Sequence, residues 1–212
     1  NLIGHSQGGL LIVLARTLTT RVEEFAQLVR RVVLVGCPLA GTQRAVEALA
    51  VGRGDFGETP FRIDAARGMA QSWPALYQML PCWNSVLDEN GRALGSSEQF
   101  TDIGGYPGAL AEGIQEDHLL RARETHALLK GSIGSFVAAV ETLVIQGEKQ
   151  DTPTWITKRG GALRTTGKEV GGRRELDFAA SEGDTLVPSE VTLASVGPSL
   201  RARTLRISGK VK

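Results

Sequence analysis

The sequence is poor in the residue types on which several classes of protein depend. Aromatic residues make up 5% of its 212 residues, and it has three histidines and two cysteines, Cys37 and Cys82. Two cysteines form at most one bridge, which excludes a disulfide-stapled fold. They also cannot complete a zinc site without help from the histidines, and no CxxC or HExxH motif occurs. We therefore expect no metal and no cofactor.

Charge of one sign and long apolar runs are also missing. With 24 basic and 23 acidic residues the net charge is +1, which gives no electrostatic reason to expect nucleic acid or an anionic membrane as the main partner. The sequence has no run of eighteen apolar residues, which would predict a transmembrane segment, and no basic-then-apolar leader is present. The composition is that of a soluble globular protein, and the lack of an evident disulfide slightly favours the cytoplasm.

The hydrophobic pattern alternates between strands and helices. Residues 1–4 resemble the end of a buried strand, 6–30 follow a helical period as one long or two short helices, and 31–36 form an apolar β-branched run typical of a strand buried on both faces. This order indicates a βαβ unit. Further along we expect helices at 40–49, 116–130 and 135–141, a buried strand at 142–147, a β-hairpin within 154–178, and short strands at 191–193 and 203–207.

The region between these elements has no clear period. Residues 54–113 mix glycine, proline and aromatic residues, so we interpret them as a cap inserted between a core at 1–53 and a core at 114–212. The large apolar residues of this region either form an acyl-chain channel or cover the edge of the sheet, and the sequence favours neither. They are Trp73, Leu76, Tyr77, Met79, Leu80 and Trp83.

The strongest local motif is G-H-S-Q-G-G at residues 4–9. In a nucleophile elbow a serine occupies a tight turn between a strand and a helix, and small residues on either side allow close backbone packing. The strand before Ser6 and the helix after it provide that context. At a helix N-terminus the backbone N–H groups stabilise negative charge, so we expect the N–H of Gln7 to form part of an oxyanion hole. The alternative is a glycine-rich turn that only starts a helix.

A serine nucleophile needs a base and an acid, which follow in the order Ser, Asp or Glu, His in this fold. Asp151 and Asp184 are the candidates for the acid. His118 and His126 precede both, and His5 lies inside the elbow, so no histidine follows the acid. We expect His126 to be a helix residue at the edge of the core.

Several motifs together resemble the lecithin:cholesterol acyltransferase-like group of α/β-hydrolases, in a bacterial-type form that includes lipases and phospholipases. After the elbow come V-L-V-G-C-P-L-A-G-T at 33–42, W-P-A-L-Y-Q-M-L-P at 73–81, T-P at 152–153, and G-D-T-L-V-P at 183–188. The resemblance implies an α/β-hydrolase fold, with a mostly parallel sheet, flanking helices and a cap. The elbow is specific for the superfamily, and the ordered set is moderately specific for the group.

The resemblance implies that Ser6 is the nucleophile and Asp184, rather than Asp151, the triad acid, because a hairpin separates the two candidates. It also implies a histidine some tens of residues beyond the acid. The sequence departs from the family where Thr185 and Leu186 replace glycine and threonine, and where Cys37 replaces a hydroxyl or small residue. Since the chain begins without methionine directly at the elbow, we expect a fold incomplete at both ends and no activity from these residues alone.

The implied activity is serine-dependent hydrolysis or transfer of an acyl group through an acyl-serine intermediate. The partner would be a lipid or other acyl ester, with transient contact to a membrane surface. The alternative is a non-catalytic hydrolase-like module for binding or assembly. We interpret G-R-G-D-F-G at 52–57 as a loop and not a dinucleotide site. The basic residues of the hairpin form either a solvated surface or a contact for anionic head groups; they are Lys158, Arg159, Arg164, Lys168, Arg173 and Arg174.

Overall fold

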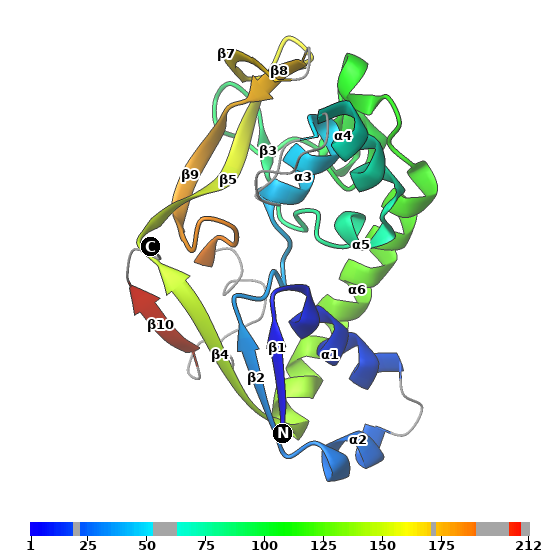
Figure 1. Cartoon of the computed structure of the whole chain (residues 1–212), viewed down its shortest axis with the longest axis vertical. Coiled ribbons are helices and arrows are strands. Elements are labelled where there is room, and N and C mark those ends of the chain that lie inside the picture. Colours follow the sequence, from blue (N-terminus) through cyan, green and yellow to red (C-terminus); the bar gives the residue numbers. More distant parts are fainter. Residues whose placement is uncertain (19–21, 53–62, 171–172, 190–203, 209–212) are drawn as a thin grey trace. The chain divides into compact units, whose positions relative to one another are not determined.

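A computed structural model describes residues 1–18, 22–52, 63–170, 173–189 and 204–208 (Figure 1). The chain divides into two compact units. Unit 1 consists of Asn1–Ala40, Glu124–Thr152 and Ser181–Lys212, and unit 2 consists of Gly41–Arg123 and Pro153–Ala180. The division into 1–53, 54–113 and 114–212 that the sequence suggested stays a prediction.

Unit 1 is built on a four-stranded parallel sheet in the order β1-β2-β4-β10. The strands are β1 (Leu2–His5), β2 (Arg31–Val35), β4 (Glu141–Glu148) and β10 (Thr204–Ser208). Parallel strands share one direction, so their carboxyl ends lie at the same edge, where ligands bind in open α/β sheets. The strand expected at 203–207 is confirmed as β10, whereas 191–193 lies outside the described residues.

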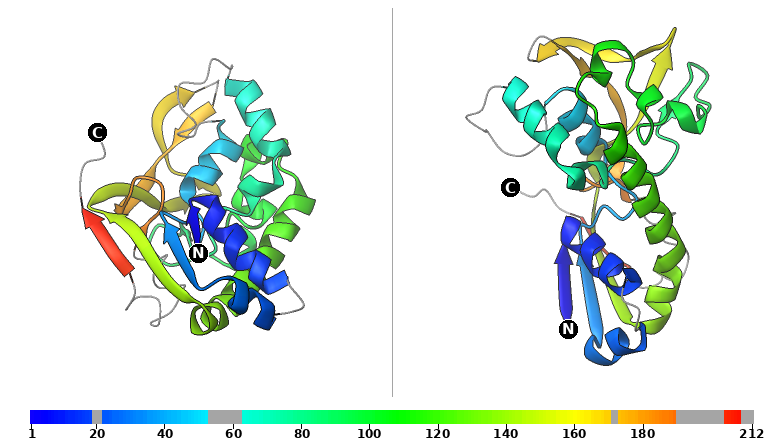
Figure 2. Two further views of the ribbon diagram at one scale, coloured as in Figure 1. Left: turned by 60° about the horizontal axis from the view of Figure 1, so that its bottom comes forward. Right: turned by 90° about the vertical axis from the view of Figure 1, so that its right-hand side faces the viewer.

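Three helices accompany this sheet: α1 (Gln7–Leu18), α2 (Val22–Leu28) and α6 (Glu116–Ala139). The region 6–30 therefore holds two helices. Helices α1 and α6 lie on the same side of β1 and β2 (Figure 2). The alternate residues of the strands that point to this side form one core with the apolar stripes of the helices; its members include Leu10, Val13, Leu34, Leu129, Phe136 and Val144.

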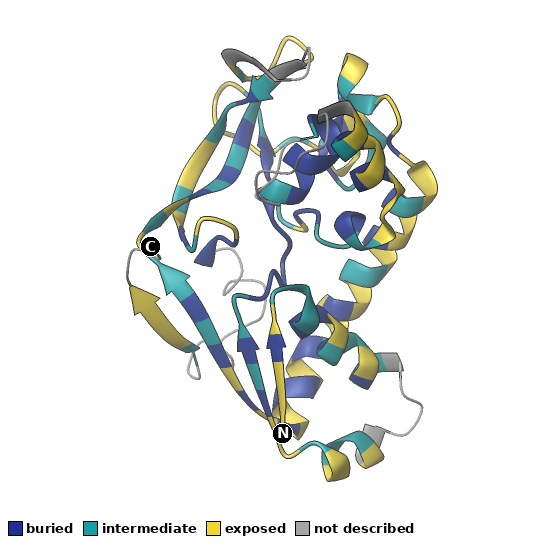
Figure 3. Ribbon diagram, in the orientation of Figure 1, coloured by how far each residue is buried: buried dark blue, intermediate teal, exposed yellow. Residues whose placement is uncertain are grey.

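The opposite face of the sheet differs from the prediction that the strands are buried on both faces. Ile3 pairs with Val33 and Val33 with Leu143, so the three share one face. Ile3 is 74% exposed, Leu143 is 40% exposed, and Ile207 on β10 is 53% exposed. Figure 3 shows β10 as largely exposed. Because α1 and α6 both pack on the first face, no helix among the described residues covers the second.

Helix α6 is continuous, although its sequence predicted two helices separated by glycines. Gly131 and Gly134 weaken the local helical preference. Leu129, Ile133 and Phe136, however, continue the apolar spacing through this stretch and are buried against the sheet. Burial of this stripe outweighs the cost of two glycines, which is about 1 kcal/mol each.

Unit 2 contains the region that showed no clear period. Its helices are α3 (Gln43–Ala50), α4 (Ile63–Ser72) and α5 (Pro74–Tyr77), with 3₁₀ turns η1 (Ser96–Glu98), η2 (Ile103–Gly105) and η3 (Gly108–Ala111). Its strands are β3 (Val86–Leu87), β6 (Ala162–Leu163), β7 (Thr165–Val170) and β8 (Arg173–Leu176). Strand β5 (Gln150–Arg159) belongs to it from Pro153 onward, and β9 (Phe178–Gly183) up to Ala180. Helix α3 begins later than predicted, because the hydroxyl of Thr42 accepts a hydrogen bond from Arg44 N–H as its N-cap.

Unit 2 has its own apolar core. Leu76, Tyr77 and Leu80 are buried in it together with Phe100 and Tyr106, while Trp73 is half exposed. The hydroxyl of Tyr77 donates to Gln71 O and accepts from Gln115 N–H, so its polar end is satisfied inside the core. Three of the six residues proposed for a channel therefore stabilise unit 2 itself.

The structure confirms the predicted α/β class, with a mostly parallel sheet and flanking helices. Within the described ranges, none of the helices has the length and apolar character needed to cross a membrane.

Candidate active site

The turn between β1 and α1 is the candidate nucleophile elbow. Ser6 has a φ of 52°, which a residue other than glycine seldom adopts. Its N–H donates to Val35 O at the end of β2 (3.0 Å), and its carbonyl accepts from Gly9 N–H (3.1 Å) as α1 begins. The side chain of Ser6 is half-buried. The serine thus sits at the carboxyl edge of the sheet and at the N-terminus of a twelve-residue helix.

Glycines make this tight turn possible by allowing the strand and the helix to touch. A Cβ at Gly4 would lie 2.7 Å from the Cα of Gly9, which is closer than any real contact. A Cβ at Gly9 would lie 2.1 Å from the sulfur of Cys37. Gly8, in contrast, has open space around it. The first and last glycines of the motif are therefore packing requirements of the turn.

Cys37 fills the space beneath the elbow. It is buried, and its thiol donates to Gly4 O at the end of β1 (3.2 Å). Burial raises the pKa of Cys37 to about 11, so the sulfur stays protonated and is a weak nucleophile at neutral pH. Cys37, one of the residues that depart from the family pattern, is thus a structural neighbour of the candidate elbow.

Asp184 lies on a short loop after β9. Its Oδ1 accepts hydrogen bonds from Leu186 N–H (3.0 Å) and Val187 N–H (2.7 Å). Gly183 and Pro188 form a bridge that closes the loop. Each N–H–carboxylate bond is charge-assisted, so one oxygen of Asp184 is fixed by its own loop.

Two glycines bring Asp184 to the carboxyl edge of the sheet. A Cβ at Gly147, near the end of β4, would lie 2.6 Å from the Cβ of Asp184. A Cβ at Gly36, directly after β2, would lie 3.3 Å from Asp184 Oδ2. Gly36 N–H donates to Ile145 O, and Val35 O accepts from Ser6 N–H. These hydrogen bonds between adjacent strand ends link the turn at Ser6 to the backbone beside Asp184. Asp151 is exposed at the start of β5, and no described residue of this edge forms a hydrogen bond or ion pair with it.

The three histidines lie on two elements, β1 and α6. His5 is exposed on β1, and His126 is half-buried on α6 in unit 1, as predicted. His118 belongs to unit 2, where its ring packs edge-on against Tyr77 at 5.1 Å and its buried Nδ1 has no hydrogen-bond partner. Among the described residues, none of the three has a hydrogen bond to Asp184.

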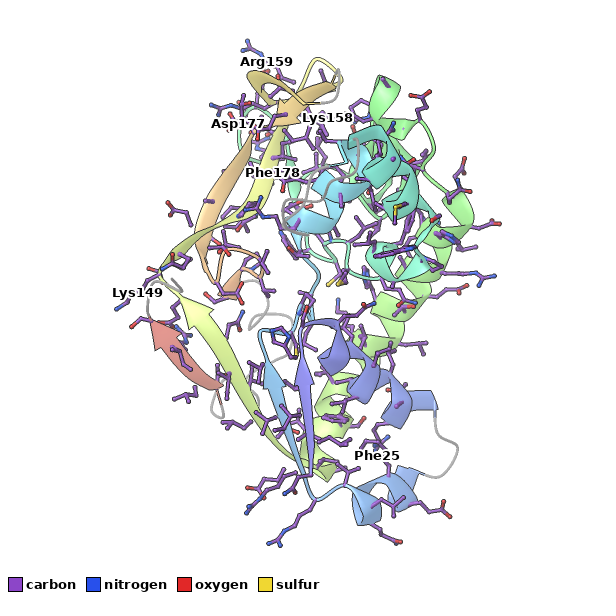
Figure 4. The ribbon with its side chains drawn as sticks, in the orientation of Figure 1. Phe25, Lys149, Lys158, Arg159, Asp177 and Phe178 are labelled. Atoms are coloured by element: carbon purple, nitrogen blue, oxygen red, sulfur yellow. The ribbon has the colours of Figure 1, made fainter. Side chains whose placement is uncertain are left out.

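The basic residues of the hairpin are offset by acidic neighbours in unit 2. Lys158 pairs with Glu98 (3.0 Å), Arg159 with Glu89 (3.2 Å), and Arg164 with Asp177 (2.6 Å). Figure 4 labels Lys158 and Arg159 on β5 and Asp177 between β8 and β9. The side chains of Lys168, Arg173 and Arg174 lie outside the described residues, as does most of the glycine-rich motif at 52–57. The paired residues favour a solvated surface over a head-group contact.

Sequence reasoning missed one residue of the site. Thr152 is buried, and its hydroxyl accepts a hydrogen bond from Thr185 N–H (3.0 Å) in the loop that contains Asp184. In the sequence, only the motif T-P at 152–153 pointed to Thr152.

A serine elbow and an acid at the carboxyl edge of one parallel sheet are the arrangement of α/β-hydrolases. The family model of lecithin:cholesterol acyltransferase matches residues 1–119, which is more than half of the sequence. The chain therefore belongs to the lecithin:cholesterol acyltransferase family, and the predicted resemblance is confirmed.

A solved structure supports the fold. The crystal structure of the Tle4–Tli4 complex contains a chain that resembles this one with a TM-score of 0.52 and 13% sequence identity. The similarity covers 100% of this chain and 53% of that chain, so this chain spans about half the length of the solved structure that it matches. No curated protein matches the chain.

Proposed function

We propose that this chain is part of a serine-dependent acyl-ester hydrolase or acyltransferase of the lipase and phospholipase kind. The observation that supports this most is the backbone at Ser6, a serine held at φ 52° between the end of a parallel strand and the start of a helix. A residue other than glycine pays for this conformation with strain, which proteins retain mainly at functional sites.

Ser6 would attack the carbonyl carbon of an ester and form an acyl-serine intermediate, and the alcohol of the ester would leave with a proton. Negative charge then develops on the carbonyl oxygen. The N–H of Gln7 in the first turn of α1 is the proposed oxyanion donor, supported by the dipole of the helix. Water or a second alcohol would release the acyl group, giving hydrolysis or transfer.

The base in this proposal is a histidine whose ring N–H donates to Asp184. The carboxylate is suited to that role because Leu186 and Val187 occupy Oδ1, whereas no described residue donates to Oδ2. A negatively charged oxygen at this position would orient the ring and stabilise its protonated form. No histidine follows Asp184 in this sequence, so the proposed base is a histidine of the longer natural chain, which the family resemblance supports.

Family membership supports an acyl ester of a lipid or another apolar acid as the substrate class. A membrane surface would then be a transient partner. The alternative function, a non-catalytic binding or assembly module, is favoured by the departures at Thr185 and Leu186, where the family has glycine and threonine.

The decisive variant is Ser6→Ala in the longest natural chain that contains these residues. We expect turnover of a short-chain nitrophenyl ester to fall by several orders of magnitude, with the melting temperature unchanged. Retention of more than a tenth of the activity would contradict the assignment. Absence of ester turnover in the unsubstituted protein, together with binding of a lipid or protein ligand, would favour the binding module.

A further inference from the structure

The loop that contains Asp184 is tied on both sides to one buried threonine. Thr152 has no exposed surface, and its hydroxyl accepts from Thr185 N–H at 3.0 Å. Gly183 lies against the same hydroxyl, since a Cβ there would come within 2.5 Å of Thr152 Oγ1. A single side chain thus contacts the residue before Asp184 and the residue after it.

The direction of these hydrogen bonds is fixed. The hydroxyl of Thr152 has one proton, and it donates this proton to Gln150 O at 3.1 Å. Its oxygen is then oriented as an acceptor for Thr185 N–H. A buried hydroxyl of this kind is costly to replace by an apolar group, because its partners lose their hydrogen bonds.

The residue that Thr152 holds is strained. Thr185 has a φ of 81°, and a β-branched residue at positive φ is a true outlier. Such a conformation persists only where the surroundings fix it. The turn at Thr185 directs the N–H groups of Leu186 and Val187 to Asp184 Oδ1 and leaves Oδ2 next to Gly36.

We propose that Thr152 is a positioning residue for the triad acid, an inference that rests on the proposed function. It does not contact substrate. Its hydroxyl holds the strained turn at Thr185. That turn presents Asp184 Oδ2 to the catalytic histidine. Because small displacements of a catalytic group cost about 10²-fold in rate, loss of this hydroxyl reduces kcat.

The test is made in the longest natural chain that contains these residues. It compares Thr152→Val, which removes the hydroxyl and keeps the shape, with Thr152→Ser, which keeps the hydroxyl. Thr142→Val is the matched control, because Thr142 is also buried in unit 1 and also donates to a backbone carbonyl, that of Val140. It lies at the start of β4, away from the carboxyl edge. We expect Thr152→Val to lower kcat about 10²-fold with KM unchanged, and Thr152→Ser and Thr142→Val to stay within threefold of the parent. Equal kcat in Thr152→Val and Thr142→Val overturns the proposal.

A double-mutant cycle shows whether Thr152 acts through Asp184. If it does, adding Thr152→Val to Asp184→Asn gives no further loss of kcat, whereas full additivity of the two losses overturns the inference. The proposed function fails separately, if Ser6→Ala and Asp184→Asn both retain activity.

Amide hydrogen exchange in the unsubstituted protein tests the geometry without any variant. The side chain of Thr185 is exposed, yet its N–H should exchange at least tenfold more slowly than in an unstructured peptide. Exchange at the unprotected rate overturns the inference.

Discussion

The two turns of the proposed site reach similar backbone conformations by different means. Ser6 and Thr185 both have positive φ, at 52° and 81°. The turn at Ser6 is made possible by missing side chains, because Gly4 and Gly9 touch. The turn at Thr185 follows a single glycine, Gly183, and is held by a hydroxyl from Thr152, 33 residues earlier. A turn built from glycines is therefore visible as a local motif, whereas a turn held by a distant hydrogen bond is not.

The largest expected effect distinguishes the two acids. Asp184→Asn should lower turnover by a factor on the order of 10⁴, since the amide cannot stabilise the protonated histidine in the correct orientation. Asp151→Asn should cost far less, because Asp151 is exposed on β5. Steady-state kinetics on both variants measure this difference. The reverse ranking would make Asp151 the triad acid. The turn at Thr185 would then not belong to the site.

The second prediction concerns the glycine-built turn. Gly4→Ala places a Cβ against the backbone of Gly9 and should destabilise the fold by about 1–3 kcal/mol. Gly8→Ala is the matched control, because it meets nothing within 4 Å and should stabilise α1 by roughly 0.5–1 kcal/mol. Denaturant unfolding measures both changes. If both variants unfold at the same denaturant concentration, the close approach at Gly4 is not a packing requirement.

A third prediction uses the thiol beneath the elbow. Burial raises the pKa of Cys37 to about 11, so the folded state favours the neutral thiol. In the unfolded chain the thiol ionises at lower pH. The stabilisation is thus complete below about pH 9 and is lost as the pH rises toward 11, with about 1 kcal/mol lost by pH 10.

The control for this titration is Cys37→Ala, which retains Cys82 and every other titrating group. Its free energy of unfolding should fall less steeply between pH 9 and 10 than that of the parent. Parallel curves would show that Cys37 does not contribute to the pH dependence.

The smallest expected effect is at the turn held by hydrogen bonds. Thr185→Gly removes the strain of a β-branched residue at φ 81° but makes the unfolded chain more flexible. Because the side chain is exposed and little packing is lost, the net change should be a stabilisation of roughly 0.5–1 kcal/mol. Thermal unfolding measures it. Destabilisation by a similar amount would mean that the threonine side chain itself holds the turn.

The same contrast explains how far the sequence predicted the structure. Strands β1, β2 and β4 and the helix after Ser6 follow from local apolar period, and the glycines mark the elbow. Asp184 could be selected only through the family resemblance. Thr152 could not be predicted, because its role depends on a hydrogen bond between distant residues.

Unit 2 shows a second limit of sequence reasoning. Tyr77, Phe100 and Tyr106 form a buried core there, although their spacing follows no helical or strand period. Short helices and 3₁₀ turns bury these rings from several directions, so no single window of sequence contains the pattern. The exposed face of the sheet in unit 1 shows the same limit. The apolar pattern of β2 predicted burial on both faces, but it does not identify which helices would cover the second face.

The central claim is that Ser6 is a nucleophile activated in this elbow. A fluorophosphonate probe reacts with such a serine and forms a stable adduct, which mass spectrometry of the digested protein locates. In the longest natural chain that contains these residues, we expect one adduct, on the peptide containing Ser6, and none in the Ser6→Ala variant. An unlabelled Ser6 in folded protein, or labelling at another serine that persists in Ser6→Ala, would contradict the claim.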